Sequence, residues 1–251
     1  MKKIYLMVLI CITAIAVFLG CAYHMYGFFG NKNNSGEVVN VNFDFDEFEK
    51  IDVDAGLIDM TITTGDKFSA SFSGLKELSP EIKEDNKALV VCQNETGIVG
   101  YNIFKPRRRN MHGVDNLLTI TVPEGTVLEE IDFTCGLGDI DILGVSAKKM
   151  DIECAMGDIN LEDLTVDDIK LEADMGDVSF KNVDAGNVDA ELAMGNFESD
   201  LVKEISEYEL KLKVSMGRCK VGNKTVANKY TQSGSNGTIS VVCDMGDVNI
   251  K

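Results

Sequence analysis

The chain has 251 residues, which is long enough to bury a hydrophobic core in one or two domains. It carries 24 Lys and Arg against 41 Asp and Glu, and this formal charge of −17 argues against a general nucleic-acid binder, because phosphates repel such a surface. Only two His are present, which argues against His-based catalysis and His-rich metal sites.

Residues 1–30 are predicted to form a membrane anchor. Lys2 and Lys3 precede a stretch, 4–31, that contains no charged residue, and about 20 apolar residues suffice to cross a bilayer. Lysines before the apolar stretch favour a cytoplasmic N-terminus. The sequence therefore predicts a single-pass protein of the cell membrane with an extracytoplasmic C-terminal domain.

Two processed forms of this N-terminus remain open. A lipoprotein would carry its lipid on Cys21, because the segment 18–21 (Phe-Leu-Gly-Cys) partly resembles the lipoprotein processing sequence, with Phe18 as a poor match. A cleaved secretory signal peptide is the second alternative, although no good small-residue cleavage site follows the apolar run. All three forms place the rest of the chain, after a linker at 31–37, outside the cytoplasm. The expected partners are the cell membrane and an unidentified surface or envelope ligand.

Residues 38–125 are expected to form an N-terminal β region that caps the fold. The segment 54–59 imperfectly echoes a corner sequence found later in the chain, and 77–87 is predicted to be a charged, polar connector. The strand-like segments are Val38–Phe45, Lys50–Val53, Leu57–Thr63, Phe68–Phe72, Ala88–Cys92 and Leu117–Val122.

An insertion loop at 96–116 contains the only concentrated positive charge beyond the anchor. Arg107, Arg108 and Arg109 are candidates for contact with an anionic ligand or a lipid headgroup. The plainer interpretation is a solvated loop.

A short cassette of an apolar residue, Gly and usually Asp recurs through residues 126–251. The glycines lie at 138, 157, 176, 195, 217 and 246, so their spacings are 19, 19, 19, 22 and 29 residues. Such a period predicts stacked structural units, here with lengthening loops toward the end. Asn196 and Arg218 replace the Asp at two corners. The predicted corner residues are Gly138, Asp139, Gly157, Asp158, Gly176, Asp177, Gly195, Gly217, Gly246 and Asp247.

Apolar residues occupy the same columns in successive copies, five, three and one residues before Gly and two and four after it. Alternation with period two indicates strands, and the change of phase at Gly-Asp indicates a tight corner. Gly suits backbone conformations that other residues resist, and Asp accepts hydrogen bonds from nearby amides. The prediction is an all-β fold, a parallel β-solenoid (β-helix-like) of stacked 19-residue rungs after one transmembrane helix. An antiparallel sandwich is the alternative.

Two of these columns contain sulfur. Cys135 and Cys154 fall on neighbouring rungs three residues before Gly, where buried free thiols are expected and a disulfide is the alternative. The column one residue before Gly holds Leu137 and then five Met. The sequence predicts that these Met fill the core rather than form a copper or thioether site.

The chain from about residue 40 to 251 resembles the bacterial putative adhesin family, whose domains have unknown function. The resemblance lies in residues 45–56 (FDEFEKIDVDAG), residues 118–125 (LTITVPEG) and the repeated Gly-Asp-Ile corners. It implies a β-solenoid fold, a surface location and an adhesin or cell-envelope role. It implies no active-site residues.

The sequence contains no Gly-x-Ser-x-Gly, HExxH or P-loop motif. Asp139, Asp158, Asp177 and Asp247 could line one corner and bind calcium, but turn hydrogen bonding explains each of them. We therefore expect a non-enzymatic, membrane-tethered extracytoplasmic module for adhesin-like binding, envelope interaction or sensing, without a cofactor and without nucleic acid as a partner. The alternatives are a carbohydrate-active β-helix enzyme and a calcium-stabilised structural protein of the cell surface.

Overall fold

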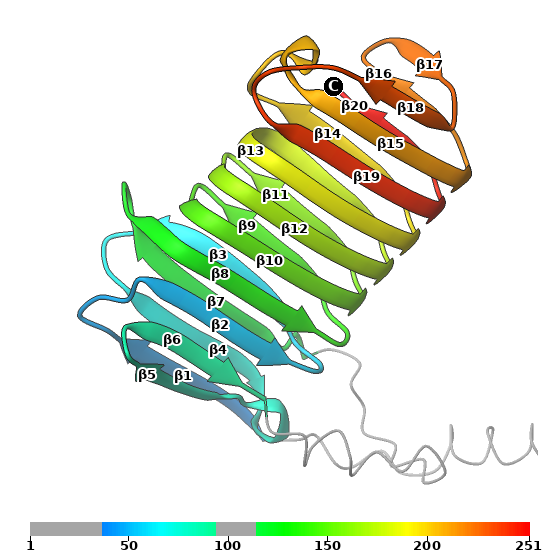
Figure 1. Ribbon diagram of the computed structural model, residues 1–251. Helices are drawn as coiled ribbons and strands as arrows, with labels where there is room; N and C mark the ends of the chain where they lie inside the picture. Colours follow the sequence, from blue (N-terminus) through cyan, green and yellow to red (C-terminus); the bar gives the residue numbers. More distant parts are fainter. Residues whose placement is uncertain (1–36, 94–113) are drawn as a thin grey trace, which may run out of the picture.

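A computed structural model describes residues 37–93 and 114–251. The all-β prediction is confirmed, because strands dominate the described residues and the two helices among them are short 3₁₀ turns, η1 (Lys76–Leu78) and η2 (Ile205–Glu207). The strands form two layers that stack into an elongated body (Figure 1). The chain alternates between the layers, so that each rung contributes a strand to both sheets.

Within the repeats, the first sheet carries the shorter strands. In spatial order it contains β1 (Val38–Asp44), β4 (Ser69–Leu75), β7 (Leu117–Pro123), β3 (Asp59–Gly65), β9 (Ile140–Leu143), β11 (Ile159–Glu162), the first half of β13 (Val178–Met194), β14 (Phe197–Leu201), β20 (Val248–Ile250), β16 (Cys219–Val221) and β17 (Lys224–Val226).

Within the repeats, the second sheet carries the longer strands. In spatial order it contains β5 (Glu81–Asp85), β6 (Ala88–Cys92), β2 (Lys50–Ala55), β8 (Val127–Cys135), β10 (Ser146–Met156), β12 (Thr165–Met175), the second half of β13, β19 (Thr238–Met245), β15 (Glu209–Met216) and β18 (Lys229–Gln232).

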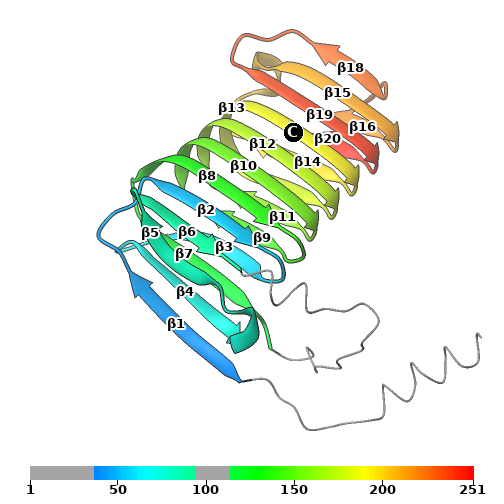
Figure 2. The same ribbon diagram turned by 60° about the horizontal axis from the view of Figure 1, so that its bottom comes forward.

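Strand direction separates the middle of the stack from its ends. The repeats pair in parallel, whereas β1, β4, β5, β17 and β18 pair antiparallel at the two ends (Figures 1 and 2). The antiparallel alternative is therefore wrong for the repeats, and the fold is solenoid-like. Hairpins at both ends cover strand edges that would otherwise pair with another chain.

Equivalent apolar residues of successive rungs are direct neighbours. Ile140, Ile159 and Val178 pair in register in the first sheet, and each is at most 1% exposed. Phe133, Ile152 and their counterparts form the facing row of the second sheet. Each fully buried side chain of this size contributes roughly 1.5–3 kcal/mol, so the shared rows hold the stack together.

The order of the rungs departs from the order of the chain. β19 lies between β13 and β15, and β20 lies between β14 and β16, so the sixth copy of the repeat is inserted between the fourth and fifth. The prediction of rungs stacked in sequence with lengthening loops is therefore wrong at this end. The 22-residue spacing includes η2, where the chain passes beyond the position of β19 to form β15. The 29-residue spacing includes β17 and β18, after which the chain returns to form β19.

A second departure concerns the predicted connector at 77–87. It contains η1 and the strand β5, which pairs with β6 through a tight hairpin. Asn86 and Lys87 make that turn with φ of 51° and 62°. Two consecutive residues with positive φ match the twist of a hairpin, which explains why so polar a segment forms a strand here.

No helix among residues 37–93 and 114–251 is long and apolar enough to cross a membrane. The predicted anchor, Cys21 and Arg107–Arg109 lie outside the described residues.

Candidate functional site

The corners between the two sheets form one long edge of the molecule. The ends of β8, β10, β12, β13 and β19 line up along this edge (Figure 1). At each repeated corner the glycine has φ near +150°, for example +148° at Gly157, and a Cβ there would lie 2.0 Å from the carbonyl oxygen of Gly138. Successive rungs thus approach so closely that only glycine fits.

The polar residue after each corner glycine links one rung to the next. Its backbone amide donates to the Oδ1 of the equivalent side chain in the preceding layer, over 2.8–3.0 Å. We call this row the corner ladder; in spatial order its members are Asp59, Asp139, Asp158, Asp177, Asn196, Asp247 and Arg218. The Asp side chains therefore serve the neighbouring rung rather than their own turn.

The two residues that replace Asp both continue the ladder. Asn196 accepts from the amide of Asp247 and donates its Nδ2 to Asp177 at 3.0 Å. Arg218 ends the ladder, with its Nε and Nη2 donating to Asp247 Oδ2 at 3.1 and 2.6 Å. These hydrogen bonds lower the pKa of Asp247 and raise that of Arg218. A groove of about 390 Å³ beside this end is lined in part by Glu198 and Lys220.

The hydrogen bonds of the ladder give each of its carboxylates a structural role. Each Oδ1 in it already accepts a backbone amide, and the part of the chain that the structure describes contains no group of three or more His, Cys, Asp or Glu arranged to hold a metal ion. These amide donors stabilise the stacked carboxylates without removing their charge.

The methionines before the corner glycines do not fill the core, so that prediction is wrong. The last inward residue of the strand is three before Gly, as at Cys154 (3% exposed), and the chain turns outward before the corner. Met156 is 44% exposed. We call the row the methionine edge; in spatial order it comprises Met156, Met175, Met194, Met245 and Met216, and these five pair in register.

The cysteine column is buried, and its thiols are free. Cys135 and Cys154 are in-register neighbours, and both donate to the carbonyl of Gly138, at 3.5 and 3.8 Å. The hydrogen bond with Cys154 and burial both raise the pKa of Cys135. A disulfide between the two is not formed in this structure.

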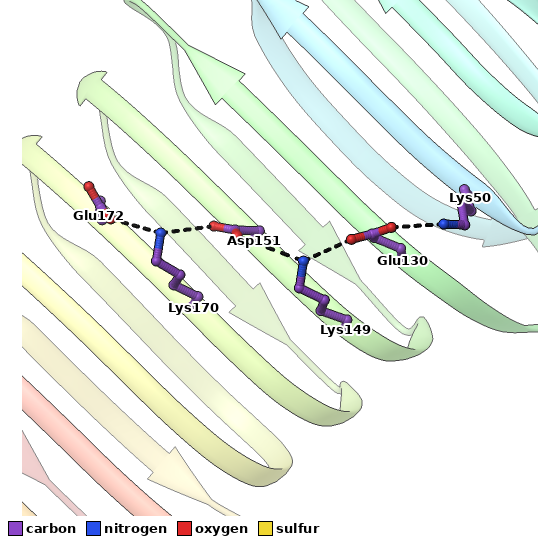
Figure 3. A network of polar contacts seen from close by, with 6 residues as sticks. All are labelled: Lys50, Glu130, Lys149, Asp151, Lys170 and Glu172. Carbon is purple, nitrogen blue, oxygen red and sulfur yellow. Dashed lines mark hydrogen bonds and ion pairs between the residues drawn. The ribbon is translucent and has the colours of Figure 1, made fainter.

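A chain of alternating charges crosses the outer face of the second sheet (Figure 3). Glu130 accepts from Lys50 and Lys149 at 2.9 and 2.8 Å, which lowers its pKa. Lys149 and Lys170 lie 4.0 and 3.8 Å from Asp151, and Lys170 contacts Glu172 at 2.8 Å. Such exposed pairs contribute at most about 1 kcal/mol each, so the network orders the surface more than it stabilises the fold.

A row of three aspartates crosses the same face. Asp52, Asp132 and Asp151 are in-register neighbours on β2, β8 and β10. Burial, followed by the charges of Asp151 and Asp52, raises the pKa of Asp132. Carboxylates one strand apart, about 5 Å, match the separation used in retaining sugar hydrolysis. A groove of about 350 Å³ on this face, however, is lined by Lys149 and Lys170 and not by this row.

We expect Asp132→Asn to raise the free energy of unfolding at pH 7 by about 0.5 kcal/mol, because it removes a carboxylate crowded by two others. A carboxyl whose pKa is raised on folding lowers stability as the pH rises from the unfolded toward the folded pKa. The gain should therefore vanish in acid, where Asp132 is neutral in both states. Urea unfolding at neutral and acid pH measures this gain in stability.

Asp189→Asn is the matched control and should give no gain, since Asp189 lies between Lys170 and Ser240. An equal gain in this variant would contradict the repulsion among the three aspartates.

Sequence reasoning placed the corner residues on turns but missed the acidic row, the ion-pair chain and the exposure of the methionine edge. Asp132 and Asp151 each lie six residues before a corner glycine, so aligning the rungs could have shown the acidic row. No pattern in the sequence indicated that the Met side chains are exposed, because the apolar alternation continues through their position.

Comparisons with known proteins give a family and a similar fold. None of the curated proteins matches the chain. A crystal structure of a putative cell adhesion protein from Clostridium sporogenes ATCC 15579 is similar, with a TM-score of 0.53 and 17% identity over 86% of this chain and 99% of that one. A putative adhesin from Bacteroides fragilis NCTC 9343 gives a TM-score of 0.45 and 17% identity over 86% and 98% of the two chains. A family model described as Toastrack DUF4097 matches residues 48–251, and the chain therefore belongs to the Toastrack DUF4097 family.

Proposed function

We propose that this chain is a non-enzymatic binding module of the bacterial cell envelope, tethered to the membrane by its N-terminal apolar segment and displayed outside the cytoplasm. The observation that carries the proposal is the ordered outer face of the second sheet. There, in-register rows of charged side chains such as Glu153, Glu172 and Glu191 repeat on successive parallel strands. Such a face offers a partner many equivalent contacts at a fixed spacing of about 4.8 Å.

The rigidity of the stack supports this role. The corner ladder and the shared apolar rows tie each rung to the next, so the outer rows keep their spacing without a ligand. Binding to a pre-organised surface loses little conformational entropy, which favours repeated weak contacts of the kind that adhesion uses. The net charge of −17 favours a partner with positive or hydrogen-bond-donating groups.

The aspartate row favours one other candidate, a carbohydrate-active enzyme. Asp132, with its raised pKa, would be the acid in such a site. Hydrolysis of envelope polysaccharides by the purified chain, lost in Asp132→Asn, would establish this candidate and overturn the non-enzymatic proposal.

Photo-crosslinking on intact bacteria tests the binding role. A photoreactive residue at Glu191 lies on the proposed face, and one at Asn160 lies exposed on the other sheet as the matched control. We expect a discrete crosslinked species from position 191 and none from 160, with the protein recovered in the membrane fraction. Equal crosslinking from both positions, or recovery of the chain in the cytoplasm, would contradict the proposal.

A further inference from the structure

The methionine edge is an exposed row of one uncommon residue type. Of the 11 Met in the chain, five lie in this single column, in register on five adjacent strands. Met156, Met175, Met194 and Met245 are 44%, 44%, 43% and 42% exposed. This agreement means that the four side chains sit in equivalent surroundings, half in solvent. Burial does not explain why an apolar residue recurs there.

Neighbouring exposed columns show that the position does not demand an apolar residue. The residues next to the five Met, in the same spatial order, are Ala155, Asp174, Ala193, Asp244 and Ser215. Two residues further back are Glu153, Glu172, Glu191, Val242 and Lys213. These columns have diverged between copies, so simple duplication of the repeat does not account for an unchanged Met. The first copy has Leu137 at this position, 48% exposed, and the other five copies retain Met.

What distinguishes Met from Leu or Ile is its thioether sulfur on a long, flexible stem. Adjacent strands are about 4.8 Å apart, so the backbones of three successive Met span about 10 Å. The outer two side chains can lean toward the middle one and bring three sulfurs together. Thioethers are soft ligands that select Cu(I) over Ca²⁺ or Mg²⁺.

We propose that the methionine edge binds a soft monovalent metal ion of the Cu(I) class through the thioether sulfurs of three successive rungs. Met175, Met194 and Met245 form the central triad, and Met156 and Met216 extend the site on either side. Thioethers carry no proton, so this binding is independent of pH near neutrality, unlike binding to thiols or imidazoles. The carboxylates of Asp158 and Asp177, one residue beyond the corner glycines, make the edge electronegative.

The test uses the full chain in detergent, labelled with ¹³C at the Met methyl groups, with accessible thiols alkylated because they also bind soft ions. Ag⁺ serves as the probe, since it shares the softness and charge of Cu(I) and is not oxidised by air. We expect the methyl resonances of Met175, Met194 and Met245 to shift on titration. The buried Met60 and Met150 should remain unchanged.

The triple variant Met175→Leu, Met194→Leu and Met245→Leu keeps the apolar surface and removes the sulfur. Its Ag⁺ affinity should fall at least about tenfold, the lower end of what is lost when even residues around a metal ligand change. Thermal melting checks that the variant folds, and the same substitution at the buried Met60 is the matched control. Unchanged affinity in the triple variant, or equal shifts at Met60 and Met150, would overturn the proposal.

Discussion

Replacing Gly157 with Val is expected to lower the free energy of unfolding by more than about 3 kcal/mol, because two costs combine. The backbone there has φ of +148°, which residues with a side chain rarely adopt. A Cβ would also lie 2.0 Å from the carbonyl oxygen of Gly138, inside the hydrogen-bonded contact between rungs. Thermal and urea unfolding of the purified variant measure the loss.

Gly222→Val separates the two costs. Gly222 also has a positive φ, of +56°, but a Cβ there would meet nothing within 4 Å. Backbone strain alone should lower stability by about 1–2 kcal/mol. If both variants lost the same amount, the close approach of the rungs at the corner would be refuted.

Val241→Asp is expected to cost more than about 4 kcal/mol, because it buries an unpaired carboxylate in the middle of the stack. Val241 is fully buried between Ala190 on β13 and Leu212 on β15. Because β15 pairs with the parallel strands of the second sheet through β19, amide exchange should accelerate throughout β15 and β18. The strands β10 and β12 should stay protected.

Val242→Asp is the matched control for this prediction. Val242 is the next residue of the same strand, points outward and lies beside Glu191 and Lys213. A charge there should cost no more than about 1 kcal/mol. Fast exchange confined to β19 in the Val241 variant, with β15 still protected, would show that β15 packs directly on β13.

Much of the architecture follows from alternation and spacing. Ile140 and Ile159 could be assigned to one inner row because equal 19-residue steps put identical columns in register. Gly157 could be assigned to a corner because the apolar phase changes there. The first inference depends on the period between copies, and the second depends on the alternation within one copy.

The order of the last rungs could not be predicted in this way. Every copy presents the same apolar columns, so β19 fits against β13 as well as β15 would. The choice depends on β17 and β18, which pair with β16 and β15 at the end of the stack and carry few buried residues. The exposure of Met156 could not be predicted either. The apolar alternation of the sequence continues to Met156, but the last buried residue of the strand is Cys154.

The corner ladder also changes how the acidic composition should be understood. Asp139, Asp158 and Asp177 each hold an amide of the next rung, so part of the negative charge is structural. The acidic rows of the outer face, including Glu153 and Glu191, remain available to a partner. A charge count alone does not separate these two groups.

The stacking order is the claim on which the corner ladder, the methionine edge and the outer rows all depend. Methyl–methyl nuclear Overhauser effects in the folded protein test it most directly. The account predicts strong effects from Ala190 to Val241 and from Val241 to Leu212, and none between Ala190 and Leu212, which lie two strands apart. A strong effect between Ala190 and Leu212, without one from Ala190 to Val241, would contradict it.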